Sequence, residues 1–347
     1  MANEYAQGHS GEAIKAMGLM YEITGNKSIL DRMVHFVDVL LSQRNDILPP
    51  PKGHRTAWTG TIAPIWPGNT GSPATGGAEQ GDSVGHLAYC ARLILTKKDL
   101  WNMRVIDGDP FHHGNTYLER AKTYLAQADV TISQFLFAHL LHLKDNKHYF
   151  FAKASPYKSG ENLPWNQQMM ISYGLQNAAV AHEILSANAT LVKEYDDIVQ
   201  ANLQWFWSLV QRKTMNKKQV YNWGYSPSQQ GGEDSNHGSL DVAGFCRAYA
   251  LNRYNITQTM MIPFANMLVE VMTLPNSQYA GRVDGTSGQG HAASTNNIRS
   301  GYLCLAYFAP NYYTKIMSAD LIEGGTTRSP DVFSRFEWVK SKLSTPS

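Results

Sequence analysis

Paired runs of apolar residues at helical spacing constrain this chain more than any other feature of its sequence. Short links join the two members of each pair, as Gly25-Asn26 does in the first. No stretch alternates apolar and polar residues for long enough to predict a sheet, so we expect an all-α fold. The expected pairs are 11–24 with 29–44, 166–185 with 191–210, and 240–253 with 257–274, and further helices are expected at 84–96, 117–143, 297–308 and 330–343.

Two long irregular segments, 46–82 and 101–116, interrupt the helices. Loops of this length in a compact protein usually have a function. Short links at one end of the helix pairs and long loops at the other are typical of an (α/α) barrel, or toroid, of about six or seven antiparallel hairpins. We therefore expect residues 1–347 to form a single barrel domain with both loops over a ligand cleft. A helical solenoid would also stack hairpins, but no fixed repeat period is visible.

Composition and charge exclude several classes of partner. The net charge is +2 with histidine neutral, and lysine and arginine form no long run, so we expect no nucleic-acid partner. The chain has no apolar run of about eighteen residues, so no membrane span is expected. Sequons at Asn26, Asn188 and Asn255 fall between helices and favour a secreted glycoprotein, which we expect to be a monomer. The cysteines lie among apolar residues and are interpreted as buried free thiols, namely Cys90, Cys246 and Cys304.

Residues 221–241 (YNWGYSPSQQGGEDSNHGSLD) concentrate reactive side chains directly before an apolar helical run. Aromatic rings such as that of Tyr225 can stack on a flat ligand, and His237 beside Glu233 and Asp234 can transfer protons. A polar loop that only caps the next helix is the alternative interpretation. We expect this segment to carry the functional site.

Several expected helices begin with side chains that helix capping does not require. Trp165-Asn166-Gln167 opens one of them, and His86 and Arg299 lie near the start of two others. If these helices point in the same direction, their N-terminal ends meet at one mouth, where backbone amides and the helix dipole favour an anionic ligand. Arg299 and Tyr302 are expected to share a helical face because they are three residues apart.

Two chemistries fit the segment from Glu233 to His237. The carboxylates of Glu233 and Asp234 are typical of the acid and base of an inverting glycoside hydrolase. Asn236-His237 beside a tyrosine suits β-elimination from a uronate instead. In that reaction neutral or cationic donors bind the sugar carboxyl, and a tyrosine or histidine removes the proton from carbon 5. A non-catalytic carbohydrate-binding protein is the third interpretation.

On these residues the sequence resembles the α/α-barrel polysaccharide lyases, which include alginate lyases and glucuronan lyases. The resemblance rests on the helical hairpins, the Trp165-Asn166-Gln167 helix start, Asn236-His237 and the later helix with Arg299 and Tyr302. It implies a lyase that acts on an anionic polysaccharide of alginate or glucuronan type and needs neither cofactor nor metal. One alginate-lyase pattern continues Asn-Asn-His with Ser-Tyr-Trp, whereas Gly238-Ser239-Leu240 follow here, so the exact uronate stays open.

The resemblance also implies roles for individual residues. Asn236 or Asn166 would neutralise the uronate carboxylate, and His237 would be a second neutraliser or the base. Tyr225 or Tyr302 would act as acid and base. The residues expected to bind substrate are Arg299, Trp165, Gln167, Glu233, Asp234, Trp223, His86 and His291.

Overall fold

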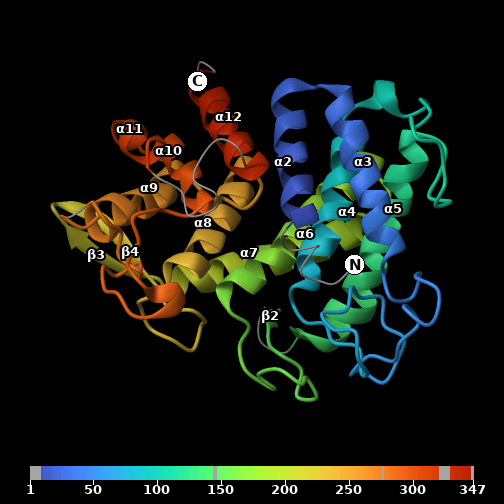
Figure 1. The fold of residues 1–347 in the computed structure, drawn as a ribbon, viewed down its shortest axis with the longest axis horizontal. Helices are drawn as coiled ribbons and strands as arrows, with labels where there is room; N and C mark the ends of the chain where they lie inside the picture. The colour runs from blue at the N-terminus through green and yellow to red at the C-terminus, as the bar shows by residue number, and fades with distance from the viewer. Residues whose placement is uncertain (1–8, 144–146, 276, 320–328, 345–347) are drawn as a thin grey trace. The chain divides into compact units, whose positions relative to one another are not determined.

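The protein is mostly helical in the computed structural model, which describes residues 9–143, 147–275, 277–319 and 329–344 (Figure 1). The α-helices are α2 (His9–Thr24), α3 (Lys27–Ser42), α4 (Gln80–Leu95), α5 (Tyr117–Thr131), α6 (Trp165–Leu185), α7 (Ala189–Leu209), α8 (Ser235–Ala250), α9 (Gln258–Asn266), α10 (Leu305–Phe308), α11 (Tyr313–Met317) and α12 (Pro330–Ser344). Short 3₁₀ helices are η1 (Lys98–Leu100), η4 (Gly290–Ala292), η5 (Ser300–Cys304) and η6 (Pro310–Tyr312), and π-helical segments are η2 (Ile132–Phe137) and η3 (Met267–Met272). Within the described ranges, no helix is both long enough and apolar enough to cross a membrane.

The chain divides into two compact units. Unit 1 comprises Met1–Leu163 and Met170–Asn202, and unit 2 comprises Pro164–Met169 and Leu203–Ser347. The division falls inside α6 and α7, because each of these helices contributes residues to both units.

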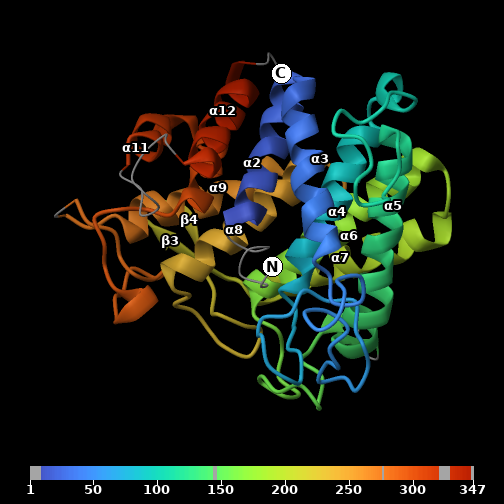
Figure 2. The same cartoon turned by 45° about the vertical axis from the view of Figure 1, so that its right-hand side comes forward.

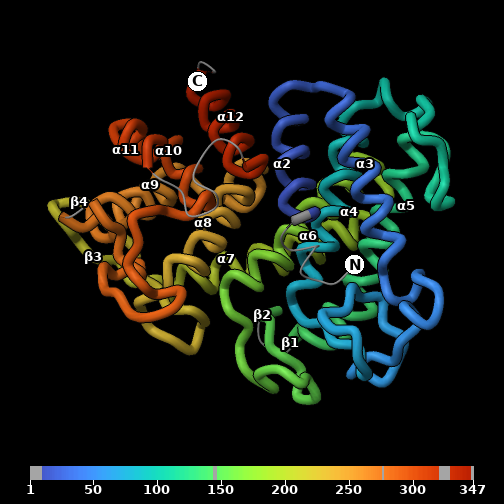
Figure 3. The backbone as a smooth tube through the Cα atoms, in the orientation of Figure 1, coloured from blue at the N-terminus to red at the C-terminus, as the bar shows by residue number. Residues whose placement is uncertain are grey.

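In unit 1, α2 and α3 form the first expected hairpin, which Figure 3 traces through its short link. Gly25 takes a positive φ of 63°, a conformation that glycine adopts without a steric penalty, and Asn26 then caps α3 by accepting the Ser28 amide at 3.0 Å. Apart from Asp38, the buried side chains of α3 are apolar, as Leu30 and Val34 are. The amphipathic pattern thus places both helices as expected.

Buried side chains hold the two long irregular segments of unit 1. Trp66, which is 0% exposed, donates from its indole to the Leu40 carbonyl at 2.7 Å, so it anchors the first segment. Arg120 on α5 donates to the Gly114 carbonyl at 2.6 Å and pairs with Asp38 of α3, which anchors the second segment. Thr116 and Glu119 form a capping box that starts α5 directly after it.

Unit 2 is built around a cluster of aromatic rings. Phe245 of α8 lies 4.5 Å from Phe206, 4.9 Å from Trp207 and 5.3 Å from Phe264, measured between ring centroids. These rings bring α7, α8 and α9 together, and aromatic side chains bury the largest apolar areas available to a core. Phe206 of α7 is buried in this core, and the half-buried Trp207 packs against it.

Two antiparallel hairpins lie outside the all-helical expectation. They pair β1 (Leu141–His142) with β2 (His148–Tyr149), and β3 (Gln211–Met215) with β4 (Lys218–Asn222). Asn216 and Lys217 take φ values of 49° and 64°, which form the tight turn between β3 and β4. β4 lies beside α9 (Figure 2), and Asn266 donates to the Gln219 carbonyl at 2.9 Å.

The expectation of three free thiols is wrong for two of them. Cys246 of α8 and Cys304 of η5 form a disulfide with their Cα atoms 6.5 Å apart, and Cys90 is the buried free cysteine. A single sequence cannot place two helices against each other, so this pairing was not visible from cysteine spacing. The disulfide fixes η5 against the helix that carries the candidate site.

Two expected helix boundaries also differ from the structure. α8 begins at Ser235 rather than at residue 240, so the motif from Ser235 to His237 forms its first turn. The helix expected at 297–308 is instead the 3₁₀ helix η5 followed by α10. Arg299 precedes η5 with extended backbone, so Arg299 and Tyr302 do not share an α-helical face.

Candidate functional site

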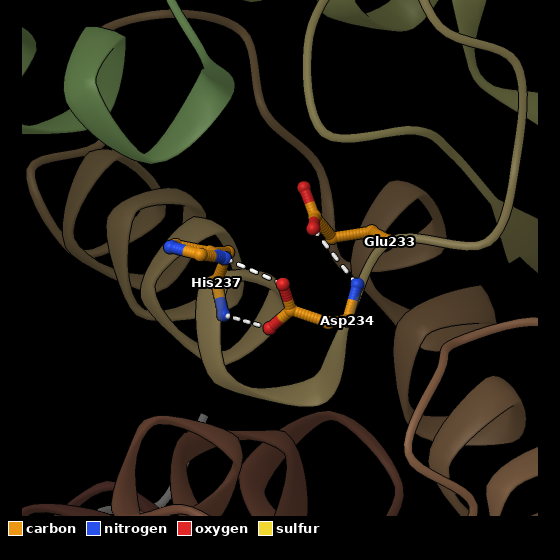
Figure 4. Close-up of side chains that lie close together, drawn as sticks. All are labelled: Glu233, Asp234 and His237. Carbon is orange, nitrogen blue, oxygen red and sulfur yellow. Dashed lines mark hydrogen bonds and ion pairs between the residues drawn. The ribbon is translucent and has the colours of Figure 1, made fainter. Parts of the chain in front are cut away.

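The first turn of α8 positions the candidate site. Asp234 is the N-cap of this helix, and its Oδ1 accepts the amides of Asn236 at 2.9 Å and His237 at 3.0 Å (Figure 4). These bonds satisfy two amides that have no partner inside the helix, which explains why the helix begins here. The capping interpretation of this segment is therefore correct, but it accounts for only one of the two Asp234 oxygens.

The second oxygen of Asp234 orients His237. The Nδ1 of His237 lies 2.6 Å from Asp234 Oδ2, a short distance typical of a charge-assisted hydrogen bond. Burial alone would raise the pKa of Asp234, but the hydrogen bonds from the His237 ring and from the two helix amides outweigh it, so the pKa is lowered. An ionised carboxylate can only accept, so Nδ1 carries the hydrogen. The lone pair of His237 is then on Nε2, which points away from both carboxylates in Figure 4.

Two further rings surround His237. The ring of Tyr225 lies 4.9 Å from that of His237, and the ring of His291 lies 5.8 Å from it. Tyr225 is half-buried and His291 is exposed, so solvent reaches this group of rings. The structure therefore brings His291 beside Tyr225 and His237, and all three are expected site residues.

The start of α6 meets the same group through the backbone. The amide of Trp165 donates to the Tyr225 carbonyl at 3.1 Å, and Asn166 is the next residue of the helix. Asn166 is 6% exposed, and within the described residues its side-chain oxygen has no hydrogen-bond partner; the same holds for the Gln167 side-chain oxygen. The start of α6 thus lies beside Tyr225, whose ring lies beside His237 in the first turn of α8.

Arg282 is a cation of the site that the sequence analysis missed. Residues 281–283 run antiparallel to 233–235: Ser235 donates to the Gly281 carbonyl at 2.8 Å, and Val283 donates to the Glu233 carbonyl at 2.9 Å. The guanidinium of Arg282 donates to the Gly232 carbonyl at 2.7 Å. Its charge also lowers the pKa of Glu233 slightly, against stronger opposing effects. A lone arginine before the glycine-rich run 285–290 gave no periodic or motif signal.

Glu233 lies beneath the site rather than at its surface. It is 2% exposed, its Oε1 accepts the Asp234 amide at 2.8 Å, and its Oε2 has no hydrogen-bond partner within the described residues. Burial, followed by the charges of Asp241 and Asp234, raises its pKa well above the ordinary carboxyl range. Glu233 is expected to bind substrate, but its carboxyl group is buried and is not accessible to a ligand.

Three other expected site residues lie in the core of unit 2. Tyr302 is 0% exposed, and its hydroxyl donates to the Ser235 carbonyl at 3.1 Å. Trp165 packs against Trp205 and Phe206, and Trp223 donates from its indole to Asp241 at 2.9 Å. These contacts support the backbone of the site, and no surface of Tyr302 is left for a ligand.

The remaining expected residues take varied positions. Asn236 is half-buried in the first turn of α8, and Arg299 is half-buried as the N-cap of η5. His86 belongs to unit 1, where it is fully buried with Nδ1 3.3 Å from the Tyr173 hydroxyl. Its surroundings are those of a core histidine.

Glu233, Asp234 and His237 also form the one cluster in the described ranges whose ligand-type atoms all lie within 4.8 Å of one another. Asp234 and His237 use the facing atoms for their mutual hydrogen bond, and Glu233 binds the Asp234 amide. We assign the cluster to proton chemistry for that reason. With Nδ1 held by Asp234, Nε2 of His237 can act as a general base and the Tyr225 hydroxyl can act as an acid.

Comparisons with known proteins add little to this geometry. No family model matches the sequence, and no curated protein matches it. A solved structure described as a polysaccharide lyase is similar to this chain at a TM-score of 0.42 and 10% identity, over 96% of this chain and 89% of the other.

Proposed function

We propose that this protein is a polysaccharide lyase that cleaves a uronic-acid-containing polysaccharide by β-elimination. The observation that supports it best is the hydrogen bond of 2.6 Å between Asp234 and the Nδ1 of His237, with the ring of Tyr225 4.9 Å from the ring of His237. This arrangement supplies an oriented base and a neighbouring acid, which are the two groups that the reaction requires.

In the proposed reaction His237 removes the proton from carbon 5 of the uronate. The electron pair of that C–H bond forms the double bond between carbons 4 and 5, and the bond from carbon 4 to the glycosidic oxygen breaks. The Tyr225 hydroxyl donates its proton to the leaving oxygen. Removal of the carbon 5 proton places negative charge on the sugar carboxyl, so donors at that group lower the barrier.

Three groups near the base are suited to hold the sugar carboxyl. Asn166 follows Trp165, which bonds the backbone of Tyr225, and the NH₂ group of its side chain can donate to a carboxylate; Asn236 precedes His237 on α8. Arg282 adds a permanent positive charge beside the same turn. The proposed substrate is therefore an anionic polysaccharide of alginate or glucuronan type, and the proposed reaction uses side chains alone.

An inverting glycoside hydrolase is less well supported by the same geometry. Such an enzyme needs a carboxylate base that activates water and a second carboxyl that protonates the leaving group. Both oxygens of Asp234 are engaged with the first turn of α8 and His237, and Glu233 is buried. Neither carboxyl offers a free oxygen to solvent in the way that a hydrolase requires.

A panel of polymers tests the proposal. Alginate, glucuronan, pectate and a glycosaminoglycan are incubated with the protein, and the ultraviolet absorbance of the unsaturated product is followed. We expect absorbance to rise with at least one polymer and to be abolished in His237→Ala without loss of the fold by circular dichroism. New reducing ends without absorbance would identify a hydrolase, and binding without turnover would identify a carbohydrate-binding protein.

We also propose that the protein is secreted and glycosylated and that its helices form an (α/α) barrel. The disulfide between Cys246 and Cys304 supports an oxidising compartment. The three sequon asparagines, Asn26, Asn188 and Asn255, are all exposed, so a glycan can be accommodated at each.

A further inference from the structure

Two carboxyl groups beneath the candidate site lack the partners that a buried charge needs. Glu233 is 2% exposed and Asp241 is 0% exposed. Each has one oxygen in a hydrogen bond: Oε1 of Glu233 accepts the Asp234 amide, and Oδ2 of Asp241 accepts the Trp223 indole. The other oxygen of each group, Oε2 and Oδ1, is buried without a partner within the described residues.

A proton bound to each carboxyl group removes the buried negative charge that has no partner. An ionised carboxylate buried with an unpartnered oxygen is far less stable than the neutral acid. Trp223 links the two groups, because its carbonyl accepts the Glu233 amide at 2.8 Å while its indole binds Asp241. Burial raises the pKa of both groups well above the ordinary range, and the charge of Asp234 adds to that effect.

The charged and titratable groups around the pair come from three segments. On α8 they are Asp234 and His237, which are bonded to each other. Arg282 on the facing segment is a cation near Glu233, but its guanidinium donates to the Gly232 carbonyl. From η5 and its N-cap, Tyr302 and Arg299 complete the surroundings, and the Tyr302 hydroxyl binds the Ser235 carbonyl. Within the described residues, no cation forms an ion pair with either buried carboxyl.

We infer that Glu233 and Asp241 are held as neutral acids and act as specificity-determining residues. Because both are neutral, the only negative charge that these three carboxyl groups place near His237 is that of Asp234. With both groups neutral, Asp234 is the one ionised carboxyl of the three, Arg282 supplies a positive charge near Glu233, and an anionic sugar can approach the base. With both ionised, two further negative charges would repel the sugar carboxylate. This inference rests on the proposed function for the identity of the ligand, but the protonation of the pair does not depend on it.

Infrared spectroscopy tests the protonation directly. Protonated and ionised carboxyl groups absorb at different infrared frequencies. If Glu233 and Asp241 are protonated, the wild-type protein in heavy water at neutral pH should show a protonated-carboxyl band. Glu233→Gln and Asp241→Asn, which keep the shape of each side chain, should each remove part of that band. If the wild-type protein has no such band at neutral pH, the inference is overturned, whether or not the variants fold.

Steady-state kinetics test the consequence for the ligand. As the pH rises from about 7 to about 10, the wild-type KM for the uronate polymer should increase on the order of tenfold, the effect of a new charge several ångströms from the ligand. In the Glu233→Gln/Asp241→Asn double variant the ratio of KM between the two pH values should stay close to one. An equal rise in KM in the double variant would refute the specificity role. Absence of unsaturated product from every polymer would instead refute the proposed function, and the infrared result would still stand.

Discussion

Substitution of Asp234 by asparagine separates the two roles that this side chain has in the structure. Asparagine is as good an N-cap as aspartate, so its oxygen can still accept the amides of Asn236 and His237. Its NH₂ group would then face the Nδ1 of His237 at the position where Asp234 Oδ2 now lies 2.6 Å away. Two donors cannot bond each other, so Nδ1 would have to give up its hydrogen, and Nε2 would carry it.

The expected result is a large loss of turnover with little loss of stability. A charge-assisted hydrogen bond contributes about 1.5–3 kcal/mol, so kcat should fall by roughly tenfold to a hundredfold, and further if Nε2 is protonated. The free energy of unfolding should change by only about 1 kcal/mol, because the cap remains and a neutral hydrogen bond from the new NH₂ group to Nδ1 replaces the charge-assisted one. Initial rates of ultraviolet absorbance and urea denaturation measure the two quantities on the same preparation.

Asp234→Ala is the matched control. It removes both roles, so it should lose turnover to a similar extent and also lose about 0.5–2 kcal/mol of stability as the N-cap disappears. The reasoning is refuted if Asp234→Asn retains kcat within about twofold of wild type, since the hydrogen bond would then not orient the base.

Two further predictions concern the tyrosines and the disulfide. Tyr225→Phe should lower kcat by about a hundredfold or more because it removes the proposed acid. Tyr302→Phe should retain kcat and lose only about 1 kcal/mol in the free energy of unfolding, since the Tyr302 hydroxyl bonds the Ser235 carbonyl. The reverse pattern would exclude Tyr225 as the acid. Replacing Cys246 and Cys304 together by alanine opens a loop with a sequence separation of 58 residues, for which chain entropy predicts a loss of about 4 kcal/mol in the free energy of unfolding. A loss below about 1 kcal/mol would show that the denatured chain gains little freedom when the crosslink is removed.

The helical part of the fold was predictable where one face of a helix is apolar. The limits of α2, α3, α6 and α7 lie close to the expected ones because periodicity and short links act locally. The start of α8 was missed because Ser235-Asn236-His237-Gly238-Ser239 has low helix propensity. The Asp234 cap and tertiary packing stabilise this turn, and neither shows in a propensity pattern.

The strands and the buried partners of the site depend on contacts that are distant in sequence. β3 is largely exposed and polar, so it shows no alternation, and the Asn216-Lys217 turn lacks the glycine that usually marks such a hairpin. His237 and Tyr225 were expected at one site because their residue types are reactive and their segment is short. Arg282 has no such signal, since only the folded chain brings it beside Glu233. Asp241 ends the segment expected to carry the site, but its burial against Trp223 was not visible in the sequence.

The packing around Gly238 restricts how this site can change over evolution or in the laboratory. A Cβ atom at position 238 would lie 3.0 Å from the Tyr302 hydroxyl and 3.2 Å from a methyl carbon of Val283, so any larger residue must displace a buried neighbour. Variation that alters polymer preference is therefore expected at exposed positions such as His291 and Leu240. A saturation library would recover mostly glycine at 238 and a wide range of residues at those two positions.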